Sequence, residues 1–128
     1  MPVKRIASWL KGRTRGKKRP TVVRAHEGNV VTPPGEVIRE IFSDGKIGVA
    51  EADVREAKLH YHKKMNEYYY VAEGKGKVRV GDQIIELNKG DFLHIPPGTP
   101  HKAFSKKGFK ILVITRKPWS PKDHHLLE

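Results

Sequence analysis

The chain has 128 residues, no cysteine and a formal net charge of +12. This length fits one domain with a sizeable core and is too short for two independent ones. The lack of cysteine excludes disulfides and thiolate metal ligands, so any metal must be held by imidazole and carboxylate groups. We expect a cytoplasmic protein that does not enter a membrane, because no apolar run reaches the roughly 20 residues of a membrane span and the start lacks a secretory signal.

The positive charge is concentrated at the N-terminus. Residues 1–25 contain nine of the 26 Lys and Arg residues and no acid, which leaves 17 basic against 14 acidic residues in the remainder. Glycine and proline interrupt these cations, so we interpret 1–25 as a basic N-terminal arm that keeps the protein in solution. Contact with nucleic acid or an acidic partner is the alternative. Ile6, Trp9 and Leu10 have helical spacing and offer a third interpretation, a short amphipathic piece that docks on the domain or on a second subunit.

Residues 35–115 have the pattern of an all-β protein. Short runs rich in β-branched and aromatic residues alternate there with Gly, Asp, Asn and Pro. The expected strands lie at 36–42, 47–55, 58–62, 67–72, 76–80, 83–87, 91–95, 101–104 and 109–115. Short strands and the lack of a helical pattern favour a closed sandwich or barrel over residues 26–118. Residues 119–128 are expected to form an extended C-terminal strap.

Two hairpin turns and one rigid loop punctuate these strands. Gly81-Asp82 and Asp44-Gly45 each separate two runs of strand character, and glycine adopts the positive φ of such turns at little cost. The later IPPGTP stretch contains three prolines without a backbone donor. It must therefore end one strand and lead as a rigid loop into the next.

Three residues of metal-binding types follow one another closely in the middle of the chain. His60 and His62 share one face of a strand, because side chains at i and i+2 point the same way. The turn-like residues 63–66 can reverse the chain and place Glu67 beside the pair. His101 follows the rigid loop and is the fourth candidate. Three imidazoles and one carboxylate suit divalent Fe, Mn, Ni, Zn or Cu and can leave positions open for water, substrate or dioxygen.

Other polar residues near this cluster have simpler interpretations. By alternation Tyr69 shares a face with Glu67, so it is the candidate catalytic tyrosine, although packing is the plainer role. The histidine at 94 is expected to be a hydrogen-bonded structural residue, and those at 26, 124 and 125 to be exposed. Lys102 should point out of the barrel. With so few acid or base groups we expect a mostly apolar pocket.

The two segments that carry these residues resemble a known pair of motifs. HYHKKMNEYYYVAEG, at 60–74, resembles the first motif of the cupin superfamily, and GDFLHIPPGTPHKAFS, at 90–105, resembles the second. The 15 residues between Gly74 and Gly90 match the spacing of small prokaryotic cupins. The sequence departs from the family pattern at Val54, where the family has glycine, and at Ser105, where it has asparagine. Both departures concern strand ends and neither removes a candidate ligand.

The resemblance implies an all-β fold, the double-stranded β-helix or jelly-roll barrel. It also implies a metal site inside that barrel whose ligands are His60, His62, Glu67 and His101. The residues it assigns to turns and to the loop that presents the last ligand are Gly74, Gly90, Pro96 and Gly98. Small cupins commonly form homodimers through sheet edges, and the outward Tyr68 and Tyr70 are candidates for such a contact.

Three functions remain open at this stage. Cupins include dioxygenases, sugar-phosphate isomerases, oxalate-degrading enzymes and epimerases, and the fold does not choose among them. The first hypothesis is a metal-dependent oxygenase or sugar-type isomerase that acts on a small oxygenated or carbohydrate-like molecule. The second is a non-catalytic module that binds a small ligand. The third is a nucleic-acid contact made through the basic arm.

Overall fold

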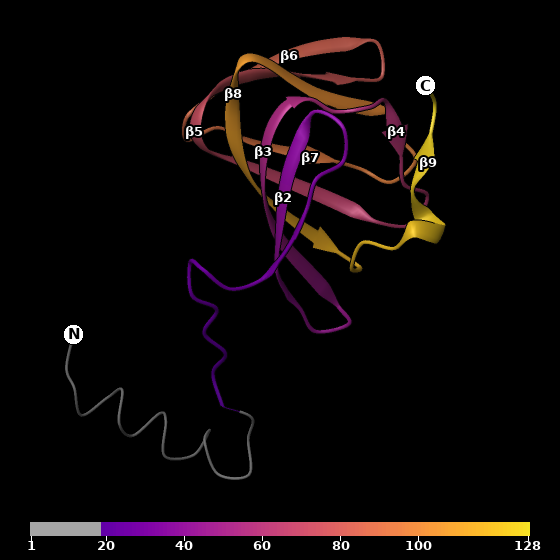
Figure 1. The fold of residues 1–128 in the computed structure, drawn as a ribbon. Coiled ribbons are helices and arrows are strands. Elements are labelled where there is room, and N and C mark those ends of the chain that lie inside the picture. Colours follow the sequence, from indigo (N-terminus) through magenta and orange to yellow (C-terminus); the bar gives the residue numbers. More distant parts are fainter. Residues whose placement is uncertain (1–18) are drawn as a thin grey trace, which may run out of the picture.

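The computed structural model describes residues 19–128, which are almost entirely β-structure (Figure 1). No α-helix occurs in this part of the chain, and it contains no helix long and apolar enough to cross a membrane. The all-β prediction is therefore confirmed. The elements are β1 (Asn29–Val31), β2 (Glu36–Ser43), β3 (Ile47–Glu56), β4 (His60–Tyr61), β5 (Asn66–Val80), β6 (Gln83–Asn88), β7 (Phe92–Ile95), β8 (His101–Arg116), the 3-10 helix η1 (Pro121–Asp123) and β9 (His125–Leu126).

Two long antiparallel strands, β5 and β8, form the frame of the barrel. They pair near both of their ends, with Glu67 opposite Thr115 and Val80 opposite His101. One side of β8 continues the sheet through β3, β2 and β1, and β5 also pairs with β6 and β7. The short β4 lies between β8 and β9. As a result, β4 and the start of β8 lie together at the side of the barrel that β9 covers (Figure 1).

The strand boundaries correct one prediction. Residues 67–72 and 76–80 belong to one strand, β5, and residues 101–104 and 109–115 belong to β8. These strands bend around the barrel without ending. Gly74 lies inside β5 beside a register shift, with φ of 75°, and so does not form a tight turn between two strands. Glycine tolerates this φ, so the strand can bend there.

Both predicted hairpin turns are present. Val80 and Gln83 pair across Gly81-Asp82, and Ser43 and Gly48 pair across the turn that contains Asp44 and Gly45. The Asp44 carboxylate accepts the backbone N–H groups of Lys46 and Ile47, both at 2.9 Å, which explains why an aspartate begins this turn.

The core is apolar and comes mainly from the inward face of three strands. Alternate residues of β3, β5 and β8 are buried, as a period of two requires. The least exposed apolar side chains of these three strands are Val54, Val71, Val78 and Ile111.

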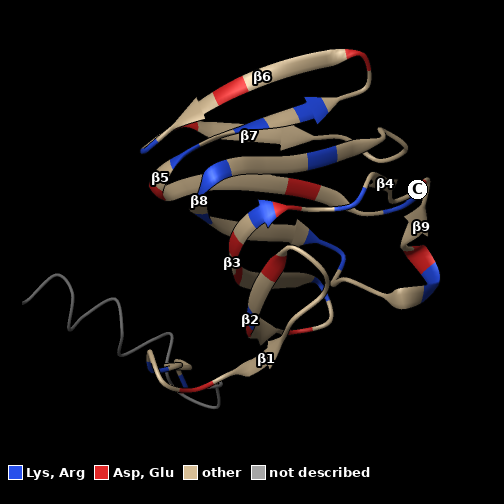
Figure 2. Ribbon diagram, turned by 45° about the horizontal axis from the view of Figure 1, so that its top comes forward, with Lys and Arg blue, Asp and Glu red and all other residues tan. Residues whose placement is uncertain are grey.

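Segments of both charge signs are spread over the strands and loops of the described chain (Figure 2). This agrees with the near balance of acidic and basic residues after position 25. Residues 1–18, with Ile6, Trp9 and Leu10, lie outside the described residues, so the arm remains a prediction.

Candidate metal centre

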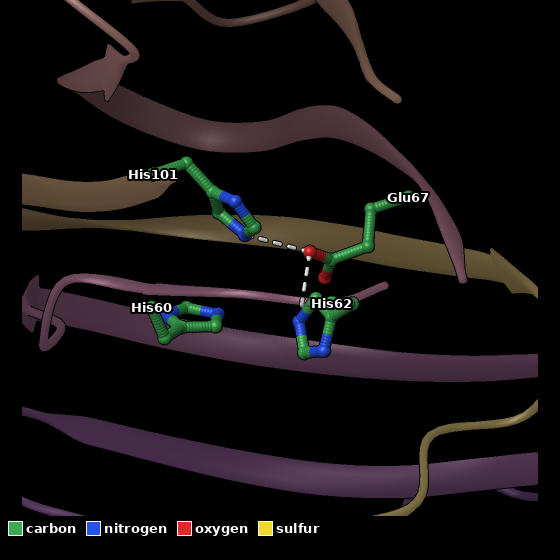
Figure 3. A group of neighbouring side chains, drawn as sticks. All are labelled: His60, His62, Glu67 and His101. Atoms are coloured by element: carbon green, nitrogen blue, oxygen red, sulfur yellow. Dashed lines mark ion pairs between the residues drawn. The ribbon is translucent and has the colours of Figure 1, made fainter. Parts of the chain in front are cut away.

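The four predicted ligand residues converge on one point. Their candidate ligand atoms all lie within 4.8 Å of one another, and the side chains face each other in Figure 3. The β4–β8 pairing sets His60 directly opposite His101, and residues 63–66 turn the chain so that Glu67 on β5 faces His62. His62, Glu67 and His101 are buried, and His60 is partly exposed.

Each of the three imidazoles is oriented by a hydrogen bond on its far side. The Nδ1 atoms of His60, His62 and His101 lie 2.7, 2.8 and 2.9 Å from a backbone carbonyl oxygen. The carbonyl groups belong to Lys58, Asp123 and Thr99, respectively. A carbonyl can only accept, so Nδ1 carries the hydrogen and the neutral ring has a free electron pair on Nε2. Backbone acceptors of this kind orient metal-ligating histidines.

Two buried atoms at the centre of the cluster have no hydrogen-bond partner. Glu67 Oε1 lies 2.7 Å from His101 Nε2 and 3.3 Å from His62 Nε2. Neither Glu67 Oε1 nor His101 Nε2 meets hydrogen-bond geometry with any described group. Two electron-pair donors this close repel each other unless a proton or cation lies between them. The donor set therefore fits a divalent cation better than it fits a self-contained hydrogen-bond network.

The protonation states of the cluster are set by burial and by its own charges. Burial acts to raise the pKa of Glu67, but the imidazoles of His101 and His62 outweigh it and hold that pKa well below its ordinary value. Burial, reinforced by nearby His101, lowers the pKa of His60 to about 4. Burial also acts to lower the pKa of His62, yet the adjacent carboxylate of Glu67 outweighs it and raises that pKa. At neutral pH the cluster thus holds an ionised carboxylate beside an uncharged His60.

Tyr69 lies where strand alternation places it, on the buried face of β5 that also carries Glu67. The side chain is 7% exposed, and its ring centroid is 6.4 Å from that of His101. Burial raises the pKa of Tyr69 well above its ordinary value, and the charges of Glu67 and Glu36 add to this effect. The hydroxyl therefore stays protonated and is available as a hydrogen-bond donor.

Glu36 is a second partly buried carboxyl group that sequence reasoning missed. It begins β2 opposite Val54, which is 2% exposed inside the barrel. Burial raises the pKa of Glu36 to about 7, and the charge of Glu67 adds to it. Because Glu36, Val37 and Ile38 include two adjacent apolar residues, alternation alone could not show which face of β2 is inward. The expectation of an apolar pocket with few acid or base groups is thus incomplete.

The remaining histidines divide into expected and unexpected cases. His26 is exposed, and His94 Nε2 is 2.9 Å from the Asn66 side-chain oxygen, as a structural histidine should be. The prediction that His124 and His125 are exposed was wrong. His124 stacks on His60 with ring centroids 4.6 Å apart, and His125 stacks on Tyr61 at 4.9 Å. The sequence carried no signal for this, because it depends on how the C-terminal strap folds back.

Lys102 points away from His101, as strand alternation predicts. Its ammonium group lies 3.2 Å from a carboxylate oxygen of Glu128 and 3.6 Å from one of Glu56.

Comparison with known families decides the classification. Residues 50–115 match the family model described as the cupin domain. The chain belongs to the cupin family. This cupin is 36% identical over 108 residues to the uncharacterized protein MJ1618 of Methanocaldococcus jannaschii, covering 77% of this chain and 86% of that one. It is also 45% identical over 42 residues to quercetin 2,3-dioxygenase of Bacillus subtilis, which is 33% of this chain but 12% of that enzyme.

Solved structures share the fold of this cupin at low sequence identity. Pac13 of Streptomyces, described as a nucleoside dehydratase and solved with uridine, aligns with a TM-score of 0.77 and 15% identity. That alignment covers 86% of this chain and 92% of Pac13. Oxalate decarboxylase of Bacillus subtilis aligns with a TM-score of 0.72 and 20% identity over 85% of this chain and 33% of the enzyme. These likenesses establish the barrel fold.

Proposed function

We propose that this cupin is a divalent-metal-dependent enzyme that acts on a small oxygenated molecule. The proposed ligands are His60, His62, Glu67 and His101. The observation that carries the proposal is the shared orientation of the three imidazoles, each with Nδ1 at hydrogen-bond distance from a backbone carbonyl, around ligand atoms that all lie within 4.8 Å of one another. This set of three nitrogens and one oxygen suits divalent Fe, Mn, Ni, Zn or Cu.

The proposed chemistry follows from the groups around the four ligands. A divalent ion bound there would supply Lewis acidity toward a carbonyl or hydroxyl oxygen. Tyr69 offers a buried O–H donor, and Glu36 offers a carboxyl group whose pKa of about 7 suits it to take or give a proton at neutral pH. A substrate with neighbouring oxygen atoms would suit these groups, because one oxygen would bind the metal while another interacted with Glu36 or Tyr69.

Two reaction classes fit this arrangement. A sugar-type isomerase would use Glu36 to move a proton and Tyr69 to donate a hydrogen bond to a substrate oxygen, and the raised pKa of Glu36 supports this class. An oxygenase would consume dioxygen at the metal, and the short match to quercetin 2,3-dioxygenase supports that class. Dioxygen uptake separates them, because an isomerase reaction needs none.

The test begins with the metal. The protein is purified without added metal and analysed for its elements, together with His101→Ala and, as a matched control, His26→Ala at an exposed site. We expect close to one divalent transition metal per chain in the wild type and the control, and a strong loss in His101→Ala. Absence of metal even after reloading would overturn the proposal.

A substrate screen on the metal-loaded protein then tests catalysis. Small hydroxy-carbonyl compounds and sugars are incubated in air and under nitrogen, with dioxygen uptake and product formation both followed. Turnover in either atmosphere supports an enzyme and assigns its class. Saturable binding without turnover would instead make this cupin a small-ligand-binding module.

We also propose that two copies of this cupin form a homodimer through the outer faces of β5 and β7. Tyr70 and Phe92 lie opposite each other in this pair and are 46% and 62% exposed. Tyr68 stacks beside them on His94, with ring centroids 5.0 Å apart. A surface of adjacent exposed aromatic rings is of the kind that a partner subunit covers.

A further inference from the structure

The strand that carries His60, and that His62 directly follows, is bordered on one side by the C-terminal strap, residues 119–128. Within β4, His60 pairs with Leu126 and Tyr61 pairs with His125 of β9. The backbone N–H of Leu127 donates to the Leu59 carbonyl at 2.9 Å. Figure 1 shows this last segment of the chain running alongside β4. A two-residue strand such as β4 therefore owes part of its hydrogen bonding to the strap.

Asp123 connects the strap directly to a proposed ligand. Its two carboxylate oxygens accept the backbone N–H groups of Lys63 and Lys64 at 2.8 and 3.1 Å. Its backbone carbonyl accepts the Nδ1–H of His62 at 2.8 Å. The side chain thus holds residue 123 against the loop after β4, and the carbonyl of the same residue orients the imidazole.

The next residue of the strap contacts His60, the proposed ligand that lies on β4 itself. The His124 ring stacks on His60 at an interplanar angle of 20° and lies 5.3 Å from His62, centroid to centroid. Trp119 Nε1 donates to His124 Nδ1 at 3.2 Å, which holds the ring in this position. Two consecutive residues of the strap, Asp123 and His124, therefore contact two different proposed ligands. Such specific contacts are more than the strap would need for packing alone.

We propose that residues 119–128 are the outer shell of the metal centre, in which Asp123 positions His62 and His124 covers His60. This inference rests on the proposed metal ligands and goes beyond them, because it makes the chain terminus part of the site. Partners that orient a ligating histidine typically change metal affinity by roughly 10- to 100-fold. The coupling is reciprocal. If the docked strap increases metal affinity, the bound metal must stabilise the docked strap by the same free energy.

The first test compares Co²⁺ binding among four chains. Binding is measured by the visible absorption of the cobalt. The four chains are the wild type, Asp123→Ala, a chain that ends at residue 118, and the matched control Lys122→Ala, an exposed residue of the same 3-10 helix. Asp123→Ala and the shortened chain should bind Co²⁺ at least 10-fold more weakly and with altered absorption bands, and Lys122→Ala should match the wild type. A fifth chain, Asp123→Asn, keeps one acceptor oxygen, and its affinity should lie between those of the wild type and Asp123→Ala.

The second test measures the reverse coupling. Hydrogen exchange of the backbone amides of residues 123–127 is recorded in the wild type with and without Co²⁺, at saturating metal. The metal should slow exchange in this segment, and the slowing should be lost in Asp123→Ala. A role confined to general stability would lower the melting temperature of Asp123→Ala but would leave its cobalt spectrum and affinity unchanged, so these two readouts decide the matter even if the shortened chain does not fold.

The outcomes separate this inference from the proposed function. If the wild type binds Co²⁺, His101→Ala does not, and Asp123→Ala has the affinity and spectrum of the wild type, the outer-shell role is overturned and the metal centre stands. If the wild type itself does not bind Co²⁺, both proposals fall.

Discussion

At the scale of single residues, the far-side hydrogen bond of each imidazole decides which ring nitrogen is free. His60, His62 and His101 all present Nε2 to the cluster for this reason. Glu67 Oε1 lies among them without a hydrogen-bond partner. This arrangement of the four side chains supports the proposed cation site, and binding would need little conformational change.

Removing one imidazole should abolish the stabilisation of the folded protein by added metal. In His62→Ala the metal affinity should fall strongly, because one of four ligands is lost. Metal at 100 times its Kd stabilises the wild type by about 2.7 kcal/mol, and the variant should lose this gain. Thermal unfolding with and without divalent metal measures the effect. An equal rise in melting temperature for wild type and variant would contradict it.

Glu36 gives a prediction for the metal-free protein as a function of pH. Its pKa is about 7 in the folded chain against an ordinary value of 4.5. As the pH rises, the unfolded chain releases this proton at a lower pH than the folded chain does. The contribution of Glu36 to the free energy of unfolding is therefore fully present below pH 4.5 and is lost as the pH rises to about 7. Glu36→Gln cannot ionise, and its stability relative to the wild type should increase over this range by at most about 3 kcal/mol.

Urea unfolding of both proteins between pH 5 and pH 8 checks this expectation. Glu86→Gln, at an exposed position of β6, is the matched control and should show a constant difference from the wild type. A Glu36→Gln difference that does not change with pH would mean that the carboxyl group is solvated like any surface group. A bound cation lowers the pKa of a neighbouring carboxyl group, so the experiment is done without metal.

The positions of the four clustered residues could be predicted from the sequence, and those of their neighbours could not. His60, His62 and Glu67 lie close together in the chain, so alternation and one short turn place them. His101 is remote, but the spacing of the second motif predicted it. His124 contacts the cluster only because the C-terminal strap folds back, and Glu36 comes under the charges of Glu67 and His101 only through the folding of β2. No local pattern records either relation.

At the scale of elements, glycines let the two long strands curve and pack. A Cβ atom on Gly76 would lie 2.7 Å from the ring of Phe109, closer than carbon atoms can approach. Strand existence and both hairpins were predictable, because turn residues and alternation are local signals. The continuity of β5 and β8 was not, because glycines that permit a bend look the same in sequence as glycines that end a strand.

Gly76→Ala should accordingly destabilise the barrel by about 1–3 kcal/mol through overpacking. Urea unfolding provides the measurement. Phe109→Leu makes room at the same place, so the double variant should lose less stability than the sum of the two single variants. Strict additivity would show that the two positions do not meet in solution.

At the scale of the whole molecule, the exposed aromatic rings on β5 and β7 predict a dimer. Phe92→Glu introduces a charge into this surface and should convert the protein to a monomer at micromolar concentration. Ile84→Glu, at an apolar position of β6 that is 55% exposed, is the control and should leave the dimer intact. Light scattering coupled to gel filtration gives the masses. A monomeric wild type would contradict the proposal.

The basic N-terminal arm gives a second prediction at this scale. If residues 1–25 only keep the protein in solution, the intact chain and a chain that begins at residue 26 should both bind nucleic acid negligibly at physiological salt. The alternative predicts an affinity that falls steeply with salt and disappears with the arm. Fluorescence anisotropy with labelled DNA and RNA at two salt concentrations distinguishes these outcomes.

The most direct test of the account is a crystal structure of the metal-loaded protein with anomalous scattering measured at the edge of the metal. The proposed metal centre predicts one strong peak at about 2.0–2.2 Å from Nε2 of His60, His62 and His101 and from a carboxylate oxygen of Glu67. Imidazoles turned away from an empty centre, or a peak elsewhere in the barrel, would contradict it.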